Sequence, residues 1–211
     1  MNGIIVLDKT ALTCKYNPVT DEGVYDDRNN GIADIVDGKG AILFHTTEGI
    51  SSEPWLRCGH AVSIHKLIGR SGVIVKMVNE WQRAWHAGVS SWGGRSNWNN
   101  FSIGYEIEHL HGVNQILDIQ YEALAQSVAY DTARFHIFDY WARFHREVAL
   151  PRGRKSDPTD FNAVRFWTRV MEIRSNWPAE WQIPLWYRPA RELGPALLQL
   201  SSMQLAIPIA A

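Results

Sequence analysis

The sequence has little cysteine, and the two cysteines it has stand far apart. Cys14 and Cys58 are the only cysteines among 211 residues, and neither belongs to a closely spaced pair of the kind that binds a structural metal ion. The two could form one disulfide. We expect free thiols in a reducing compartment, because proteins kept there rarely hold disulfides.

Long apolar runs are also missing. No apolar stretch approaches the roughly 20 residues that cross a bilayer as a helix. The apolar run from Ile4 to Leu7 is short and has no basic segment before it, which is not the pattern of a signal peptide. We therefore expect no transmembrane segment and no signal peptide, with synthesis and folding in the cytoplasm.

Neither sign of charge is in clear excess. The chain has 21 Lys and Arg against 22 Asp and Glu, and a formal net charge of −1. Nucleic-acid-binding domains carry a basic surface, so we expect no nucleic-acid partner. What the chain does have is 45% hydrophobic residues and 10 tryptophans. That composition predicts one globular domain with a real core.

Three apolar segments have the composition of β-strands: residues 40–47, 72–78 and 101–110. In the third segment, Tyr105 and Ile107 alternate with Gly104 and Glu106, so the two sets face opposite sides of a sheet. Between the first two segments, we interpret residues 50–68 as a loop or short helix followed by another extended piece. Residues 8–40 are rich in Asp, Asn and Gly and are interpreted as a long loop.

Apolar residues at helical spacing predict two helices. The first helix falls within residues 118–138, with its periodic positions at Tyr121, Leu124, Ala125, Val128, Thr132 and Phe135. The second spans residues 158–174 and begins at Thr159 or Asp160 as N-cap. Its predicted core-facing residues are Phe161, Val164, Trp167, Val170 and Met171.

This mixed order of strands and helices predicts the α/β class. We expect a single domain with a central mixed β-sheet flanked by helices, plus a C-terminal helical extension. The boundaries are a loop-rich segment at 1–40, a core at 41–174, and the extension at 175–211 with a helix near 190–202. The aromatic residues of the extension either pack against the domain, which we favour, or form a binding surface: Trp177, Trp181, Trp186 and Tyr187.

Candidate metal ligands stand in two places far apart in the sequence. His45 ends the first predicted strand, and a lone histidine there is more often a structural residue. The stretch "HREVALPRGRKSDPTDF" adds His145, Lys155 and Asp157. Pro158 disfavours helical backbone at Asp157, and in extended chain Lys155 and Asp157 share a face. Two histidines and a carboxylate are a ligand set of catalytic zinc sites, although the stretch alone also fits a solvated basic turn.

Glu106 is the third element of a possible site. Its neighbours Tyr105 and Ile107 face the opposite side of the predicted strand, and Gly104 leaves room beside it for another group. An isolated carboxylate on a strand is more often solvent-facing than catalytic. Glu106 therefore gains weight only in combination with the histidines and Asp157.

Four ordered segments together resemble the zinc-dependent N-acetylmuramoyl-L-alanine amidase family, the type 2 amidase domain that peptidoglycan recognition proteins share. The segments are "ILFHTTEG", "VSIHKLIGRSGVIVKMV", "RAWHAGVSSWGGRSNWNNFSIGYEIE" and "HREVALPRGRKSDPTDF", within residues 41–170. The resemblance implies that family's fold and hydrolysis of the amide between N-acetylmuramic acid and L-alanine in peptidoglycan or a muropeptide. It also implies one Zn²⁺ ion per chain.

The resemblance implies a role for each matching position. His45, His145 and Asp157 would bind zinc. Glu106 would be the general base and then the general acid, and Lys155 would stabilise the oxyanion. A further group would shape the site or contact substrate: His86, Arg95 and Asn100.

The sequence departs from the family pattern at two points. Ile64 stands where some phage amidases carry a tyrosine, which favours the branch that relies on Glu106. The loop after His145 is longer than the family's short form, because "VALPRGRK" has extra residues around Pro151. This leaves His136 as a rival to His145, although we place His136 at the end of a helix, where a packed histidine is expected.

Within this resemblance the biological role has alternatives. We expect a cell-wall lytic enzyme of the endolysin or autolysin type, which acts on the wall after release. One alternative is a cytoplasmic amidase that recycles anhydro-muropeptides. The other is a receptor of the same fold that binds peptidoglycan without cleaving it, and the complete set of candidate site residues argues against it.

Overall fold

A six-stranded mixed sheet organises the molecule. The computed structural model describes residues 4–13, 25–26, 40–58, 62–80, 82–135 and 137–177. The strands of the main sheet, in spatial order, are β1 (Val6–Asp8), β5 (Ile74–Lys76), β4 (Lys66–Ile68), β9 (Ser102–Ile107), β3 (Ala41–Thr46) and β10 (Ala142–Phe144). Only the β4–β5 pair is antiparallel. The predicted α/β class and central mixed sheet are confirmed.

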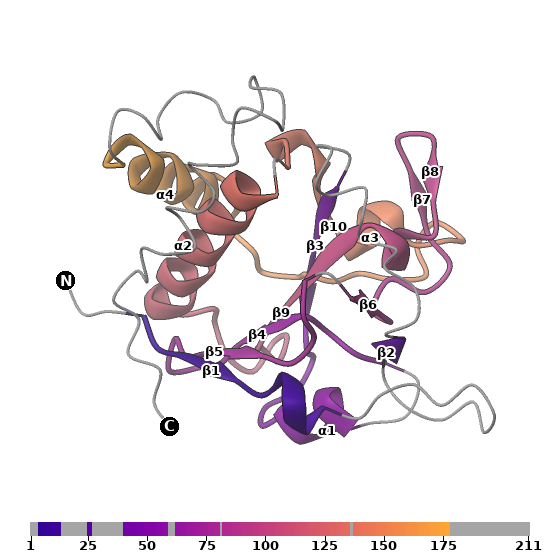
Figure 1. Ribbon diagram of the computed structural model, residues 1–211, viewed down its shortest axis with the longest axis horizontal. Coiled ribbons are helices and arrows are strands. Elements are labelled where there is room, and N and C mark those ends of the chain that lie inside the picture. The colour runs from indigo at the N-terminus through magenta and orange to yellow at the C-terminus, as the bar shows by residue number, and fades with distance from the viewer. Residues whose placement is uncertain are drawn as a thin grey trace.

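Two small ribbons and several short helices complete the architecture (Figure 1). The ribbons pair β2 (Tyr25–Asp26) with β6 (Arg83–Ala84), and β7 (Ser91–Trp92) with β8 (Arg95–Ser96). The α-helices are α1 (Glu53–Cys58), α2 (Asp118–Arg134), α3 (His145–Val148) and α4 (Ala163–Ser175). Short 3-10 turns lie at Thr10–Leu12, Trp98–Asn100 and Asp139–Trp141. Among the described residues, no helix has the length and apolarity needed to span a bilayer.

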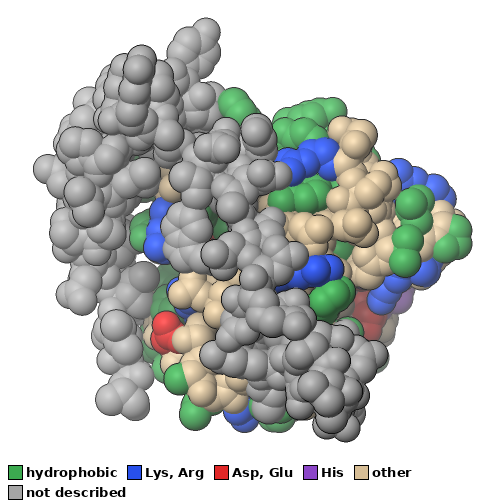
Figure 2. Space-filling model, turned by 45° about the vertical axis from the view of Figure 1, so that its right-hand side comes forward, with side chains coloured by type: hydrophobic (Ala, Val, Ile, Leu, Met, Phe, Trp, Pro, Cys, Tyr) green, Lys and Arg blue, Asp and Glu red, His purple; other side chains and the backbone are tan. Residues whose placement is uncertain are grey.

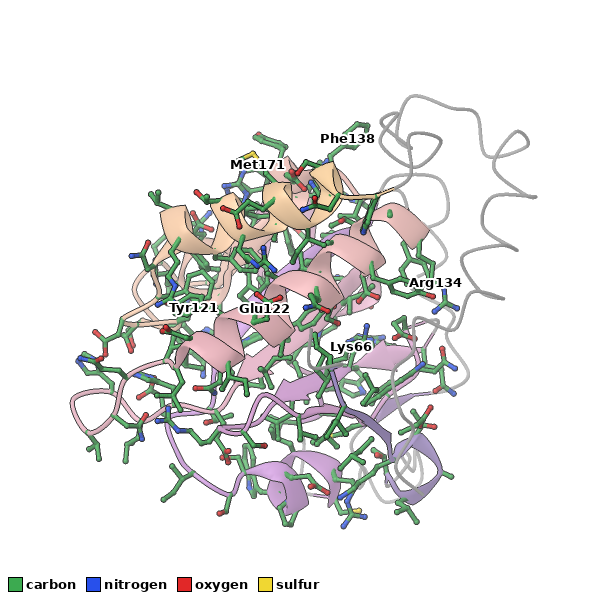
Figure 3. All side chains as sticks on the ribbon, turned by 90° about the vertical axis from the view of Figure 1, so that its left-hand side faces the viewer. Lys66, Tyr121, Glu122, Arg134, Phe138 and Met171 are labelled. Carbon is green, nitrogen blue, oxygen red and sulfur yellow. The ribbon has the colours of Figure 1, made fainter. Side chains whose placement is uncertain are left out.

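The two faces of the sheet have different covers. Helices α2 and α4 lie on one face and α1 on the other (Figure 3). Every residue of β3 is buried, as expected for a parallel strand in the middle of a covered sheet. The alternation predicted for residues 101–110 holds, because Tyr105 packs in the main core with α2 residues such as Leu124 and Val128, which leaves Glu106 on the other face.

Helix α4 begins later than predicted. Its N-cap is Asn162, whose side chain accepts a hydrogen bond from the backbone N–H of Arg165 at 2.9 Å; the prediction of Thr159 or Asp160 was wrong. The buried residues of α4 are Phe166 and Val170, so the prediction holds for Val170 and missed Phe166. The predicted core residues Val164 and Met171 are 79% and 58% exposed, and Figure 3 shows Met171 on the outer side of α4.

The structure also bears on the predictions for the cysteines and for the C-terminal extension. Cys58 is disulfide-bonded, so the prediction of a free thiol was wrong for it. Its Sγ lies 3.8 Å from the Leu12 carbonyl oxygen, a tertiary contact that sequence spacing does not reveal.

Trp177 of the C-terminal extension packs against the main core, which is the alternative that the sequence analysis favoured. Cys14 and the remaining extension, including Trp181, Trp186, Tyr187 and the helix predicted near 190–202, lie outside the described residues.

A buried ion-pair cluster ties the sheet to α2. Lys66 Nζ lies 2.7 Å from Asp131 Oδ2 and 3.1 Å from Glu80 Oε1. Tyr105 donates its hydroxyl proton to Asp131. Burial alone would lower the pKa of Lys66, but the charge of Asp131 outweighs it and holds that pKa well above its usual value. Lys66 therefore stays charged although it is buried.

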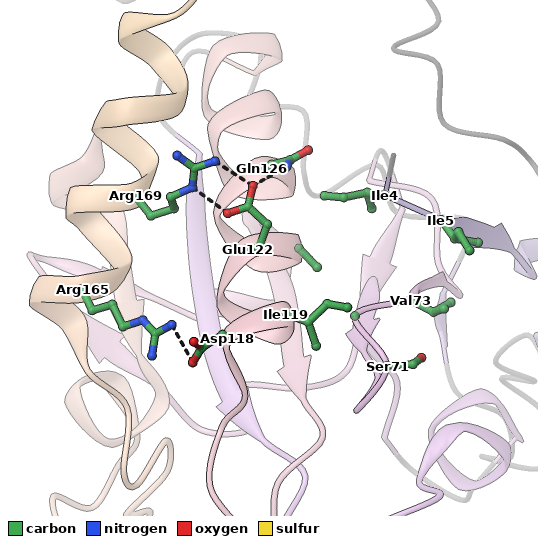
Figure 4. A pocket seen from close by; sticks show the side chains of 12 residues that line it. Ile4, Ile5, Ser71, Val73, Asp118, Ile119, Glu122, Gln126, Arg165 and Arg169 are labelled. Carbon is green, nitrogen blue, oxygen red and sulfur yellow. Dashed lines mark hydrogen bonds and ion pairs between the residues drawn. The ribbon is translucent and has the colours of Figure 1, made fainter. Parts of the chain in front are cut away.

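A pocket of about 640 Å³ opens between α2, α4 and the β4–β5 turn (Figure 4). Its charged residues already pair with one another: Arg169 Nε lies 2.6 Å from Glu122, and Arg165 lies 2.7 Å from Asp118. None of the candidate site residues lines it. The chemistry of this fold must therefore be sought elsewhere.

We expect Lys66→Met to lower the free energy of unfolding by about 3–5 kcal/mol, because it leaves the buried Asp131 carboxylate without its cation. Urea denaturation measures this loss. Lys9→Met is the matched control, since Lys9 pairs with Glu53 at 2.7 Å near the surface and should cost less than about 1 kcal/mol. Equal losses in the two variants would contradict the prediction.

Candidate active site

Three neighbouring parallel strands bring the candidate residues to one edge of the sheet. β9, β3 and β10 lie side by side, and His45 on β3 is in register with Glu106 on β9. Phe144, the last residue of β10, is in register with Phe44, so His145 follows directly beside His45. The carboxyl ends of parallel strands are where α/β folds place their ligand sites.

His45, His145 and Asp157 form a compact set of metal-binding atoms. His45 Nδ1 lies 3.0 Å from His145 Nδ1 and 3.4 Å from Asp157 Oδ2, and the third side of the triangle is 3.1 Å. Tetrahedral coordination with bonds of about 2.0–2.1 Å separates ligand atoms by about 3.3 Å. Within the described part of the chain, these are the three residues whose ligand atoms group closely enough to hold a metal ion.

The two histidines are oriented by hydrogen bonds on their far nitrogens. His145 Nε2 lies 3.1 Å from the Ala87 carbonyl oxygen, which can only accept; the proton is therefore on Nε2 and the lone pair of Nδ1 faces the metal site. His45 Nε2 lies 3.1 Å from His86 Nδ1. Burial lowers the pKa of His45 to about 4, helped by the neighbouring His145, so at neutral pH His45 is the uncharged ligand form.

Asn99 holds the segment that orients both histidines. Its side-chain oxygen accepts hydrogen bonds from the backbone N–H groups of His86, at 2.9 Å, and Ala87, at 2.7 Å. These two residues in turn contact His45 and His145. The sequence analysis missed Asn99, because nothing in its local pattern separates it from the adjacent Asn100.

Gly104 makes room for the His86 ring against β9. A Cβ atom at this position would lie 2.5 Å from Ile64 Cδ1 and 2.8 Å from the His86 ring, closer than packed atoms approach. The buried Ile64 side chain thus lies beside the glycine, at the position where the sequence analysis noted a missing tyrosine. Only glycine lets strand, histidine and isoleucine pack this closely.

The long loop after His145 is folded back and anchored. The Asp157 carbonyl oxygen accepts from the Arg146 backbone N–H at 2.9 Å, and Arg154 donates to the carbonyl oxygens of Ala87 at 3.2 Å and Val89 at 3.0 Å. Burial opposes ionisation of Asp157, but its contacts with the His145 and His45 side chains lower its pKa below the usual range. The extra residues are therefore absorbed without moving the carboxylate away from the histidines.

Glu106 lies beside the metal-binding set, in register with His45. Its Oε2 is buried and has no hydrogen-bond partner among the described residues. Burial, and next the Asp157 carboxylate, raise the pKa of Glu106 well above its usual range, while Lys155 opposes the shift. A carboxylate with a raised pKa beside a candidate metal site is suited to exchanging a proton.

Lys155 lies at the rim of the site. Its side chain is exposed, yet its charge contributes to the pKa values of both His45 and Glu106. The loop that carries it also exposes Arg152 and Arg154. Lys and Arg side chains are visible among the described residues on the molecular face that Figure 2 turns forward.

The remaining predicted site residues lie further out. Arg95 stacks its guanidinium on the Phe101 ring at 3.8 Å, beside the start of β9, whereas Glu106 is near the end of that strand. Asn100 belongs to the turn before β9, and its Oδ1 is buried without a partner among the described residues. His86 lies in the site, against His45. The rival ligand His136 is outside the described residues.

Comparison with known proteins places these residues in a family context. Residues 37–160 match the family of N-acetylmuramoyl-L-alanine amidases. The chain is 41% identical over 108 residues to the 1,6-anhydro-N-acetylmuramyl-L-alanine amidase AmpD of Citrobacter freundii, over 50% of this chain and 55% of that protein. For the Escherichia coli K12 protein of the same name, identity is 50% over 66 residues, or 30% and 34% of the two chains. The chain thus spans about half the length, or less, of these curated relatives.

Solved structures of amidases share the fold. A crystal structure of an AmpD selenomethionine derivative is 28% identical with a TM-score of 0.56, over 81% of this chain and 96% of that chain. AmpDh3 of Pseudomonas aeruginosa, in complex with an anhydromuramic pentapeptide, is 26% identical with a TM-score of 0.57, over 76% and 72%. AmiD of E. coli, bound to anhydro-N-acetylmuramic acid-L-Ala-D-gamma-Glu-L-Lys, is 28% identical with a TM-score of 0.56, over 62% and 56%.

We expect Asn99→Ala to weaken zinc binding about 10- to 100-fold, the usual effect of losing a group that orients metal ligands. Competition with a zinc-binding dye measures the dissociation constant. Asn99→Asp is the matched control, because it keeps an oxygen acceptor in the same place and should bind zinc more tightly than Asn99→Ala. Equal zinc affinity in the wild type and Asn99→Ala would show that the segment is held by other contacts.

Proposed function

This chain belongs to the N-acetylmuramoyl-L-alanine amidase family, and from that premise we propose that it is a zinc-dependent hydrolase of the amide between N-acetylmuramic acid and L-alanine. The observation that carries the proposal is the convergence of His45, His145 and Asp157 to within 3.0–3.4 Å beside Glu106. Two imidazoles and a carboxylate are a donor set suited to catalytic zinc, which keeps its fourth position open.

Zinc would be held by the Nδ1 atoms of His45 and His145 and by the Asp157 carboxylate. When bound, such an ion lowers the pKa of water to about 7 and polarises a carbonyl group. The protein's own contribution is orientation. Hydrogen bonds to the 86–87 segment orient both imidazoles before a metal binds.

Glu106 would move the proton. It takes a proton from the attacking water and passes it to the leaving nitrogen of L-alanine, because an amine is a poor leaving group until it is protonated. Its raised pKa suits a group that must hold the proton between these two steps. The charge of Asp157, which contributes to that shift, would be partly neutralised by a bound cation, so the shift becomes smaller with metal present.

Lys155 would stabilise the negative charge on the tetrahedral carbon's oxygen. It is exposed at the rim and has the reach of a flexible side chain, so it can follow the substrate into the site. Losing a donor of this kind typically costs about 10²–10³ in rate. His86 orients His45, and Arg95 and Asn100 are kept as outer candidates for contacts with the glycan or peptide.

The names of the relatives favour soluble 1,6-anhydro-muropeptides as the substrate. The curated relatives are named for that substrate, and two similar structures hold anhydromuramic peptides. The lytic role expected from the sequence stays a prediction, because the endolysin amidase LysCS of Clostridium intestinale is only 14% identical with a TM-score of 0.54 and is informative about fold alone. A non-cleaving receptor is disfavoured because all five chemical groups are present in one chain.

We expect Glu106→Gln to retain zinc but lose about 10²–10⁴-fold in kcat, because the amide cannot accept the proton. His45→Ala and Asp157→Ala should lose zinc and activity together. Metal analysis and hydrolysis of a muropeptide are measured on each variant. Glu172→Gln, the same change on an exposed face of α4, is the control. A zinc-loaded Glu106→Gln enzyme with full activity would refute the role of Glu106.

The natural substrate can be decided by direct comparison. The zinc-loaded enzyme is given purified sacculi in one reaction and soluble anhydro-muropeptides in another, and released stem peptide is quantified. We expect kcat/KM to favour the soluble substrate. Faster release from intact sacculi would instead support the lytic role, and absence of stem peptide from both would contradict the amidase proposal.

A further inference from the structure

A second group of polar residues lies just beyond the candidate active site. Glu48, His109 and Asp160 each follow a site residue by three positions, namely His45, Glu106 and Asp157. Three residues of chain reach at most about 10 Å. Contacts join the three segments, since Thr159 Oγ1 on one lies 3.5 Å from Glu48 Oε1 on another. The group therefore forms a rim at the same edge of the sheet.

The rim is acidic, and among the described residues the basic side chains that contact its carboxylates are histidines. Asp160 Oδ2 lies 2.7 Å from His111 Nδ1 and 3.4 Å from His109 Nε2. Glu48 accepts from the Thr46 hydroxyl at 2.9 Å and from the His111 backbone N–H at 3.3 Å. Among the described residues, no Lys or Arg forms an ion pair with Glu48 or Asp160.

His109 adds a buried side chain without a hydrogen-bond partner to this rim. Its side chain is fully buried, and neither ring nitrogen has a hydrogen-bond partner among the described residues. Its Nε2 points toward Asp160, at 3.4 Å. Nearly all buried polar groups in native proteins are hydrogen-bonded, so an unpaired one calls for a ligand or another explanation.

We propose that Glu48, His109 and Asp160 form a subsite for an alkylammonium group, and that the group is the side-chain amine of the diamino residue in the stem peptide. The identity of that group rests on the proposed amidase function, whose relatives include a protein crystallised with a peptide ending in L-Lys. An ammonium carries three N–H donors and no acceptor, which matches a rim that offers carboxylate oxygens and one imidazole nitrogen.

A second metal ion fits this rim less well. Within the described residues, the set with three ligand atoms inside 4.8 Å of one another is His45, His145 and Asp157, and the rim does not form another. Hydrogen bonds of about 2.8 Å to an ammonium place their acceptor atoms further apart than metal–ligand bonds of about 2.1 Å do. The rim also acts at close range on the site, because the charge of Glu48 is one cause of the raised pKa of Glu106.

Binding and turnover together test the subsite. The two ligands are N-acetylmuramyl-L-Ala-D-γ-Glu-L-Lys and the same molecule with the lysine amine acetylated, which removes the charge. Calorimetry on zinc-loaded Glu106→Gln measures binding without hydrolysis, and kcat and KM are measured on the wild type. We expect the charged ligand to bind about tenfold more tightly than the acetylated one. The difference should appear as a lower KM for the charged ligand, with similar kcat values for both. High salt should reduce the preference for the charged ligand.

Variants separate the subsite from a general structural effect. Asp160→Asn and Glu48→Gln should reduce the preference between the two ligands to about one. Asp118→Asn removes the same charge from an exposed position on α2 and should keep the preference. A loss of kcat on both ligands without a change in their ratio would point to a structural role and would overturn the subsite.

The remaining outcomes distinguish the two proposals. Equal binding of the two ligands, with normal hydrolysis of both, overturns the subsite and leaves the amidase function standing. Preference for the charged ligand without any hydrolysis by the wild type supports the subsite and overturns the amidase function. A second zinc ion that is lost in Asp160→Asn would assign the rim to a metal and overturn the ammonium proposal.

Discussion

Parallel pairing of β9, β3 and β10 is the constraint on which the rest of this structure depends. Because His45 and Glu106 are in register, their side chains emerge side by side on one face of the sheet. The register of β10 then brings His145 to the same edge, across 100 residues of sequence. A slip of one residue in any of these pairs would turn a site residue to the opposite face. The site is thus a consequence of sheet register.

Hydrogen bonds behind the candidate metal ligands then orient the side chains that the strand register brings together. Asn99 fixes the 86–87 backbone, and that segment fixes the far nitrogens of His45 and His145. Burial keeps His45 uncharged at neutral pH, and Gly104 lets the His86 ring lie against β9. The opposite face carries the buried Lys66–Asp131 pair, which bonds the sheet to α2. The same strands therefore hold a structural charge cluster on one side and the candidate active site on the other.

Sequence reasoning succeeded where the physical signal is local. Alternation along residues 102–107 separates Tyr105 from Glu106, and the motif segments point to the residues that gather in the site. It failed where the deciding contact is distant. The face of α4 was misjudged because α4 packs into the main core through Phe166 and Val170, which leaves Val164 and Met171 exposed. The state of Cys58 and the part played by Asn99 depend on chain segments more than ten residues away.

The sequence by itself determined which elements form and which residue types can do chemistry. Period-2 and period-3.6 patterns specify a strand or helix through neighbours along the chain, and a ligand set is a matter of composition. The tertiary structure alone decided that His45, His145 and Asp157 approach within 3.0–3.4 Å, that Arg95 stacks on Phe101, and that an acidic rim lies beyond the site. Those outcomes depend on strand order and loop closure, and neither leaves a periodic trace in the sequence.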